Sequence, residues 1–239
     1  MSGHSKWSQI KRQKGITDVK KGQTFTKLSS AISLAVKQGG GVADPSQNFR
    51  LRLAVDTARA SNMPKENVER AIKKGLGKEE GSLEKAVYEG FAPGGVSIII
   101  EAATDNHLRT TAEIKSFFSK EGGTFARPGA VSYQFRETGR IIIPGVNKFD
   151  DLFSKAVDAG AEDVKIENDS IIIDVPVEAL MDVKNALGEA GYNPVSVDII
   201  RKPINKISLP DVEKEKVTGF IEKLEENEDV QKIYSNLEL

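Results

Sequence analysis

The feature that most constrains the fold is a change of hydrophobic pattern at Gly75 to Gly81, a charged segment punctuated by glycine. Before this segment, apolar residues recur with the period of amphipathic helices. After it, short apolar runs of strand length alternate with helical stretches. The charge changes at the same place, because residues 1–80 contain 16 Lys and Arg against 7 Asp and Glu, and residues 81–239 contain 18 against 28. This asymmetry predicts a basic module joined to acidic domains that have a different task.

Three short helices are predicted in the basic part, over residues 24–76. An apolar stripe from Phe25 to Val36 marks the first helix, which the glycines at 39–41 terminate. Asp44 followed by Pro45 predicts the start of the second helix, because Asp caps exposed backbone N–H groups and Pro suits the first helical position. Pro64 predicts the start of the third helix, which ends before Gly75.

The acidic part contains the pattern β-α-β-β-α-β, which is typical of a ferredoxin-like domain. The predicted elements are a strand at 140–143, a helix at 149–159, strands at 164–166 and 171–175, a helix at 177–190 and a strand at 195–200.

The segments on either side of this pattern are incomplete when each is taken alone. The predicted elements are strands at 87–89, 96–102 and 131–135 with a helix at 106–120, and then a strand at 207–209, a helix at 211–226 and a strand at 230–234. We expect 96–135 and the tail to form a second split βαβ domain into which the first is inserted. The alternative is one continuous mixed sheet.

The predicted fold class is therefore α+β, with a basic N-terminal helical bundle followed by two ferredoxin-like α/β domains, one inserted into the other. The predicted domains are a basic arm and three-helix domain at 1–80, a discontinuous α/β domain at 81–136 plus 205–239, and an inserted ferredoxin-like domain at 137–204.

Composition disfavours several classes of protein. The chain has no cysteine, which removes disulfides, thiolate nucleophiles and cysteine-ligated zinc, and is typical of a reducing cytoplasm. The longest apolar run, Val96 to Ile100, is far too short to cross a membrane. The glycines at 39–41 and 94–95 match no nucleotide-binding loop, and the carboxylates lack EF-hand spacing. We expect a cytoplasmic protein without membrane contact, metal or cofactor.

The run Asp105-Asn106-His107 with Arg109 has the composition of a catalytic cluster, but an Asp–His pair needs a nucleophile and no cysteine is present. The alternative is a helix-cap turn in which Asp105 or Asn106 accepts hydrogen bonds from exposed backbone N–H groups. We favour the cap and expect no enzymatic activity.

The strongest functional signal is a basic arm, Ser2 to Lys27, which contains seven Lys and Arg, one acid and the only tryptophan, Trp7. Ammonium and guanidinium groups suit phosphates, and a flat indole suits a base or sugar. The alternative is a solvated arm whose Trp7 packs on the next helix. The predicted nucleic-acid contacts are His4, Lys6, Trp7, Lys11, Arg12, Lys14, Lys20, Lys21, Lys27, Arg50, Arg52, Arg59, Lys65, Arg70, Lys73, Lys74 and Arg109.

Base reading by the bundle is a weaker hypothesis. Asn62 and Asn67 have the side chains for it, although Asn62 suits a helix cap better, and no recognition-helix signature is present.

In the α/β part, Tyr88, Phe91 and Tyr133 are candidates for stacking on RNA bases, although strand aromatics more often belong to the core. Arg127 is a candidate to extend a phosphate-contacting edge. The acidic surface of these domains favours a protein partner instead.

Five blocks of sequence carry a resemblance to a known family. They are GHSKW at 3–7, NMPKENVERAIKKG at 62–75, YEGFAPGGV at 88–96, TDNHLRTTAEI at 104–114 and DVQKIYSN at 229–236. In this order, and across essentially the whole chain, they resemble the YebC/PmpR family. Each block alone is a weak signal, whereas five in sequence are very specific.

The resemblance implies a three-domain, cytoplasmic, non-enzymatic regulator of gene expression. Members are described as DNA-binding transcriptional regulators, and this is the function that we predict first. The alternative is a ribosome-associated translational activator that binds ribosomal or transfer RNA and relieves stalling, for example at proline runs. The long arm, the single tryptophan and the lack of a duplex-reading motif favour RNA on physical grounds.

The chain departs from the family pattern near Gly123 to Tyr133. Relatives carry Gly-Ser-Val where this chain has Gly129-Ala130-Val131, so the resemblance assigns no role to that loop. The predicted partners are nucleic acid, and the ribosome or another protein on the acidic domains. We expect the protein to be a monomer.

Overall fold

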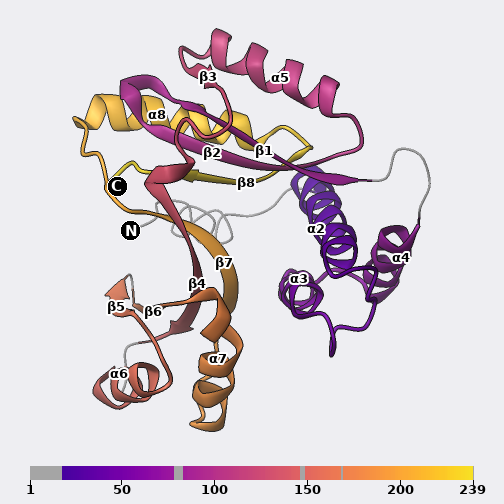
Figure 1. The fold of residues 1–239 in the computed structure, drawn as a ribbon, viewed down its shortest axis with the longest axis vertical. Helices are drawn as coiled ribbons and strands as arrows, with labels where there is room; N and C mark the ends of the chain where they lie inside the picture. The colour runs from indigo at the N-terminus through magenta and orange to yellow at the C-terminus, as the bar shows by residue number, and fades with distance from the viewer. Residues whose placement is uncertain (1–17, 78–82, 146–148, 168, 239) are drawn as a thin grey trace. The chain divides into compact units, whose positions relative to one another are not determined.

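The structure is a computed structural model that describes residues 18–77, 83–145, 149–167 and 169–238, with the backbone alone at 18–21. The described residues form two compact units, one within Met1–Phe135 and Pro203–Leu239 and the other within Arg136–Lys202. Helices accompany two separate four-stranded sheets, so the predicted α+β fold class is confirmed (Figure 1).

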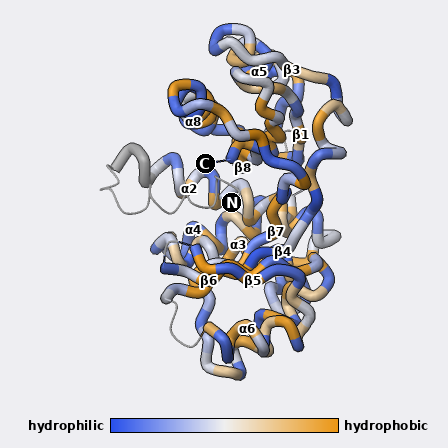
Figure 2. The backbone as a smooth tube through the Cα atoms, turned by 90° about the vertical axis from the view of Figure 1, so that its left-hand side faces the viewer, coloured by the Kyte–Doolittle hydropathy of each residue, from blue (hydrophilic) through white to orange (hydrophobic). Residues whose placement is uncertain are grey.

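The first unit begins with three helices, α2 (Asp18–Gln38), α3 (Phe49–Ala60) and α4 (Lys65–Leu76). Each helix buries one apolar stripe against the other helices. Hydrophobic and hydrophilic residues alternate along the chain (Figure 2). The buried residues of this core are Ile32, Ala35, Val36, Leu51, Val55, Ala58, Met63, Val68 and Ala71.

The closest packing in the bundle is between α2 and α4. The hydroxyl of Ser33 donates to the carbonyl oxygen of Ala71 at 2.8 Å. Gly75 lies inside α4, and a Cβ atom there would come within 2.7 Å of the Ser33 carbonyl oxygen and 2.8 Å of the Val36 Cβ. Gly75 therefore allows two helix backbones to approach, rather than terminating the helix as the sequence predicted.

The starts of the first two helices differ from the prediction. Helix α2 begins at Asp18, six residues before the expected bundle. Helix α3 begins at Phe49 and not at Asp44-Pro45, because Asn48 provides the stronger cap. The side chain of Asn48 is buried, accepts from the N–H of Leu51 at 3.1 Å and donates to the carbonyl of Ala35 at 2.9 Å. One amide thus satisfies groups at the ends of two helices.

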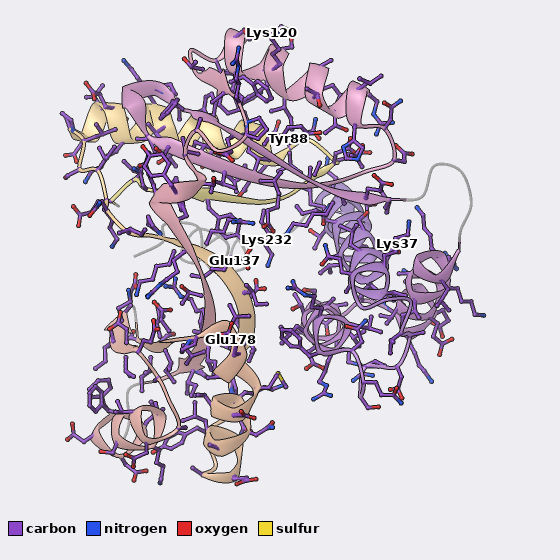
Figure 3. All side chains as sticks on the ribbon, in the orientation of Figure 1. Lys37, Tyr88, Lys120, Glu137, Glu178 and Lys232 are labelled. Carbon is purple, nitrogen blue, oxygen red and sulfur yellow. The ribbon has the colours of Figure 1, made fainter. Side chains whose placement is uncertain are left out.

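The first sheet has the strand order β3-β1-β2-β8, and every pairing in it is antiparallel. Its strands are β1 (Glu84–Phe91), β2 (Ser97–Thr104), β3 (Thr124–Ala126) and β8 (Val230–Ser235). Helices α5 (His107–Lys120) and α8 (Asp211–Glu225) lie side by side on one face (Figure 1). Phe118, Phe220 and Tyr88 belong to the core beneath them, and Tyr88 can be located in Figure 3.

Two strands expected in this unit are absent from the described sheet. Residues 131–135 form a 3-10 turn at Ser132–Gln134 before β4 begins at Phe135, because the backbone N–H groups of Val131 and Ser132 donate to Glu89 rather than to a neighbouring strand. In the tail, Ile207 makes only an isolated parallel bridge with Leu237. The sheet is completed instead by β1, which pairs with β2 across the turn at Pro93–Gly95, and by β3.

The second unit has the strand order β5-β6-β4-β7, which is the ferredoxin-like arrangement that the sequence predicted. Its elements are β4 (Phe135–Pro144), α6 (Phe149–Asp158), β5 (Asp163–Glu167), β6 (Ser170–Val175), a 3-10 turn (Val177–Ala179), α7 (Leu180–Glu189) and β7 (Ser196–Pro203). Buried isoleucines on β4 and β6 face each other, with Ile141 paired to Ile173.

An ion pair is buried in this second sheet. The guanidinium of Arg140 donates to both carboxylate oxygens of Asp174, from Nε at 2.6 Å and Nη2 at 2.8 Å, and Lys202 approaches the same carboxylate at 2.8 Å. Burial alone would raise the pKa of Asp174, but the hydrogen bonds and charges of Arg140 and Lys202 hold this pKa below its ordinary value. The carboxylate is therefore ionised at neutral pH in the folded unit.

Replacing Gly75 with Ala should destabilise the bundle by about 1–3 kcal/mol, because the added methyl group meets backbone atoms of α2 that have no room to move. Urea unfolding of the full chain, followed by hydrogen exchange in α2 and α4, measures the effect. Gly77→Ala is the matched control, since its Cβ would meet only the Lys74 carbonyl at 3.4 Å. Equal stability of the two variants would contradict the close approach.

Replacing Asp174 with Asn should destabilise the second unit by about 3–5 kcal/mol, because the buried guanidinium of Arg140 loses the charged carboxylate to which it donates. The more exposed pair Arg136–Glu162 supplies the control, and Glu162→Gln should cost only about 0–1 kcal/mol. Hydrogen exchange in β4 and β6 reports both changes.

The same carboxylate predicts an acid dependence. Since the pKa of Asp174 is lower in the folded chain than in the unfolded chain, its contribution to stability is complete above the ordinary value of 3.8 and is lost as the pH falls further. Asp174→Asn should remove this part of the acid sensitivity of β4 and β6, and an unchanged acid profile would contradict the assignment.

Candidate nucleic-acid interface

The predicted contacts fall into three groups according to what the structure describes. The first group, in the arm, lies outside the described residues: His4, Lys6, Trp7, Lys11, Arg12 and Lys14. The second group, Lys20 and Lys21, lies in the first turns of α2, where the backbone alone is described. The third group lies in the described helices: Lys27, Arg50, Arg52, Arg59, Lys65, Arg70, Lys73, Lys74 and Arg109.

The exposed bundle cations come from α3 and α4. We call Arg59, Arg70, Lys73 and Lys74 the bundle cations, because all four side chains are exposed and none pairs with a carboxylate within the described part of the chain. Two neighbours make weak contacts: Arg50 lies over the ring of Phe49 at 5.9 Å, and Lys65 is 3.7 Å from Glu69.

Two other predicted contacts are engaged within the protein. The ammonium of Lys27 donates to the carbonyl oxygen of Glu225 at 2.6 Å. The guanidinium of Arg52 donates to the carbonyl oxygens of Pro45 and Ser46 at 2.8 and 2.7 Å, and so holds the loop before α3. Lys37, labelled in Figure 3, similarly donates to the carbonyl oxygen of Leu83 at 3.0 Å. These amines and guanidiniums satisfy backbone acceptors, which makes them poorer phosphate ligands than the bundle cations.

The arginines of the two parts of the chain differ in their partners. Among the described residues, none of the four arginines between 49 and 70 pairs with a carboxylate. Of the five arginines after residue 83, four pair with Asp or Glu, and Arg127 is the exception in the described chain: Arg109, Arg136, Arg140 and Arg201 are the paired ones. Most of the arginines of the described α/β part are therefore paired with carboxylates, whereas the arginines of the described bundle are not.

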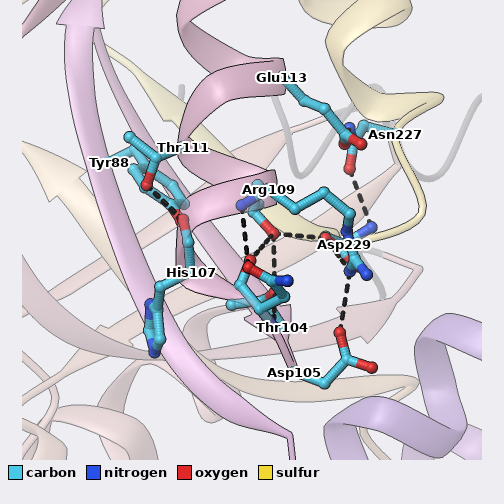
Figure 4. A network of polar contacts seen from close by, with 11 residues as sticks. Tyr88, Thr104, Asp105, His107, Arg109, Thr111, Glu113, Asn227 and Asp229 are labelled. Carbon is cyan, nitrogen blue, oxygen red and sulfur yellow. Dashed lines mark hydrogen bonds and ion pairs between the residues drawn. The ribbon is translucent and has the colours of Figure 1, made fainter. Parts of the chain in front are cut away.

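The cluster around Arg109 forms a structural network (Figure 4). Asn106 caps α5, and its side chain accepts from the N–H of Arg109 at 3.0 Å, so the predicted cap is confirmed. The guanidinium of Arg109 lies 3.0 Å from Asp105 and 3.0 Å from Asp229. Thr110 also donates to Asp229, at 2.6 Å. The network ties the start of α5 to the turn before β8.

The charge of Arg109 is balanced in this network. The hydrogen bond and charge of Asp229, and then those of Asp105, raise the pKa of Arg109, which keeps the guanidinium cationic and paired. These two ion pairs account for an arginine at this position, so no phosphate contact is needed to explain it. The two carboxylates would also repel a polyanion.

The histidine of this region lies at the protein surface. The ring Nε2 of His107 lies 2.9 Å from Glu84 on the surface, where both side chains are more than half exposed. Over the residues with described placement, no group of three or more His, Cys, Asp or Glu side chains is arranged to hold a metal ion. No helix in that same part of the chain is long and apolar enough to cross a membrane.

The connection between α3 and α4 has the dimensions of a helix-turn-helix. Four residues, Ser61 to Pro64, join the two helices, and Asn62 takes a left-handed conformation with φ of 57°. The N–H groups of Asn62 and Met63 donate back to Arg59 and Ala58, so Asn62 caps the C-terminal end of α3, which agrees with the prediction that it is a helix-capping residue.

Sequence reasoning missed the role of Glu89. This side chain is 5% exposed, and its carboxylate accepts from the backbone N–H groups of Gly129, Val131 and Ser132 at 2.7, 2.7 and 3.0 Å. Burial raises the pKa of Glu89, but these three hydrogen bonds outweigh burial and lower the pKa overall. Glu89 alternates along β1 with the core-facing Ala86, Tyr88 and Gly90, and its partners lie 40 or more residues away, so no local pattern in the sequence predicts its burial.

Comparisons with known proteins cover the whole chain. Family models described as "TACO1/YebC protein N-terminal domain" and "TACO1/YebC second and third domain" match residues 5–78 and 83–237. Relatives named "Probable transcriptional regulatory protein" include one from Geotalea uraniireducens (42% identical, 100% of this chain and 96% of the relative) and one from Acidithiobacillus ferrooxidans (45%, 100% and 95%). A crystal structure of a conserved hypothetical protein, Aq1575 from Aquifex aeolicus, is similar with a TM-score of 0.84 and 40% identity, over 92% of this chain and 91% of that one.

Replacing Arg109 with Ala should loosen the network without changing nucleic-acid binding. Hydrogen exchange should accelerate at the start of α5 and in the turn at 227–229, because Asp105 and Asp229 lose their shared counter-charge. Affinity for nucleic acid and its salt dependence should stay at the wild-type values. A reduced salt slope for Arg109→Ala would place this residue in the interface after all.

Proposed function

The chain belongs to the TACO1/YebC family, and from that premise we propose that it is a non-enzymatic, nucleic-acid-binding regulator of gene expression. The names of these relatives describe transcriptional regulation, which supports a DNA-binding transcriptional regulator as the first form of the proposal. In this account the basic helical part contacts the phosphate backbone, and the acidic α/β part contacts a protein partner.

The observation that carries the proposal is the difference in charge pairing. The bundle cations are exposed on two adjacent helices and lack carboxylate partners among the described residues, whereas four of the five later arginines are paired. Keeping unneutralised like charges together is unfavourable for a folded domain, because they repel one another. A polyanion removes this repulsion and gains counterion-release free energy on binding.

Duplex DNA is supported by one local feature. The four-residue connection from Ser61 to Pro64 places α4 after a turn of helix-turn-helix length, with Lys65 and Arg70 exposed in its first half. The exposed carboxylates of Glu66 and Glu69 on the same helix would repel phosphates and so weaken DNA binding at this surface.

RNA on the ribosome is the second candidate, and a different observation favours it. Tyr133 is 72% exposed, and the nearby loop residue Arg127 has no carboxylate partner in the described chain; an exposed ring suits an unstacked base, and a guanidinium suits a phosphate. In this form the protein is a translational activator that binds ribosomal or transfer RNA.

The quadruple replacement of Arg59, Arg70, Lys73 and Lys74 with Ala tests the proposal. Each lost phosphate contact should reduce the slope of log K against log salt by about 0.9 on duplex DNA or about 0.7 on single strands. Fluorescence anisotropy of the full chain with labelled 30-nucleotide oligonucleotides, titrated over a range of salt, measures the slope. An unchanged slope would reject the bundle as the binding surface.

The matched control removes the same number of positive charges from the α/β part. Lys115, Lys120, Lys206 and Lys216 are exposed and have no carboxylate contact among the described residues. Their joint replacement with Ala should leave the slope at the wild-type value. If both quadruple variants reduce the slope of log K against log salt equally, binding depends on the net charge of the protein and not on the bundle cations.

Sedimentation of the native protein in a gradient of cell lysate separates the two ligands. Comigration with ribosomal particles that RNase abolishes would support the RNA form. Protein that remains in the light fractions and protects promoter DNA in footprinting at controlled salt would support the DNA form.

A further inference from the structure

Outside the bundle, one surface loop is held unusually firmly. This loop, Arg127 to Tyr133, connects β3 to the turn before β4, and Glu89 accepts hydrogen bonds from three of its backbone N–H groups. A carboxylate that accepts several backbone N–H groups makes strong, charge-assisted hydrogen bonds. Val131 is fully buried beside them. The loop therefore has a fixed conformation rather than an ensemble of conformations.

Both ends of the loop are also fixed. At its start, Ala126 pairs with Glu89 in the sheet, and the N–H of Ala130 donates back to the carbonyl of Arg127 at 3.1 Å. At its end, the side chain of Gln134 accepts from the hydroxyl of Ser97 at 3.2 Å. Gly129 has φ of 88°, a conformation that permits the tight turn between the two ends.

The side chains that this scaffold presents outward are a cation and an aromatic ring. Arg127 is exposed and is the one arginine of the described α/β part without a carboxylate partner. Tyr133 is 72% exposed, although its ring is large and apolar. The hydroxyl of Tyr133 accepts a hydrogen bond from the side chain of Gln134 at 3.3 Å, while most of the side chain stays in solvent.

The fixed loop, the exposed guanidinium and the exposed ring together indicate the kind of ligand that the loop could bind. A ring of this kind stacks on a flat partner, and a guanidinium that lacks a carboxylate suits a phosphate. A fixed loop presents both groups without the entropy cost of ordering them on binding. A nucleotide whose base is unpaired offers the matching base and phosphate, whereas the bases of a duplex are stacked and out of reach.

We propose that the loop from Arg127 to Tyr133 is a second nucleic-acid contact site, which binds an unpaired nucleotide by stacking its base on Tyr133 and by pairing its phosphate with Arg127. This inference rests on the proposed function and deepens its RNA form, which draws on the same two residues. It uses residues other than the bundle cations and a different unit of recognition. It gives the α/β part a nucleic-acid role of its own, in which Glu89 is a positioning residue.

The test compares single-stranded RNA, single-stranded DNA of the same sequence and the corresponding duplex, all bound to the full chain. Tyr133→Ala should weaken binding to single strands about 5- to 100-fold with little change in salt slope, because stacking is not ionic. Tyr133→Phe should bind normally, and Arg127→Ala should reduce the single-strand slope by about 0.7. Duplex binding should be unchanged in all three variants. The two single strands distinguish RNA from DNA as the source of the nucleotide.

Leu108→Ala is the control, because Leu108 is 86% exposed in the same unit but lies outside the loop. Wild-type affinity of Tyr133→Ala for both single strands would overturn the loop site while leaving the bundle proposal intact. Failure of the wild-type chain to bind any of the three oligonucleotides would instead overturn the proposed function. Thermal unfolding of each variant checks that the fold is unchanged.

Glu89→Gln tests the positioning role. The amide keeps one acceptor oxygen but points N–H donors at backbone N–H groups, so hydrogen exchange at 129–132 should accelerate. Single-strand affinity should fall toward that of Tyr133→Ala, while duplex affinity is retained. A loosened loop with unchanged single-strand affinity would show that its fixed conformation serves only the fold.

Discussion

The close approach of α2 and α4 at Gly75 is the constraint on which the basic part of this protein depends. Three helices of 12 to 21 residues have little apolar surface to bury, so their stability depends on one shared core and on the close approach of two helix backbones at Gly75. The positions that remain exposed to solvent lie mainly on α4 and at the end of α3, and they include Arg59, Arg70, Lys73 and Lys74. That surface is free to present cations, provided that the shared core offsets their mutual repulsion.

The α/β part handles charge in the opposite way. Arg140 is buried against Asp174, and Arg109 is held between two carboxylates, so these cations organise the fold and contribute little to the outer field. Within the described α/β part, Arg127 is the arginine that escapes this neutralisation, and it belongs to the loop that Glu89 fixes. The pattern of pairing separates structural arginines from candidate functional ones better than exposure alone, because Arg109 is also exposed.

The sequence predicted what local patterns determine and missed what distant partners determine. The periodicity from Phe25 to Val36 and the β-α-β-β-α-β pattern specified helices and strands that the structure contains, since such patterns depend on near neighbours. Asp44-Pro45 was a sound local cap, but Asn48 also bonds Ala35 of the preceding helix. The alternation at 131–135 resembled a strand, yet Glu89 removes its donors. The pairing of Arg109 with Asp229 spans 120 residues and left no local trace.

The most direct test of the central claim is ultraviolet cross-linking of the full chain to the nucleic acid that it binds in the cell, with the cross-linked peptides identified by mass spectrometry. The account predicts cross-links within residues 1–77 and at the loop from Arg127 to Tyr133. Cross-links confined to the outer faces of α5 and α8, or to the unit within Arg136–Lys202, would contradict it.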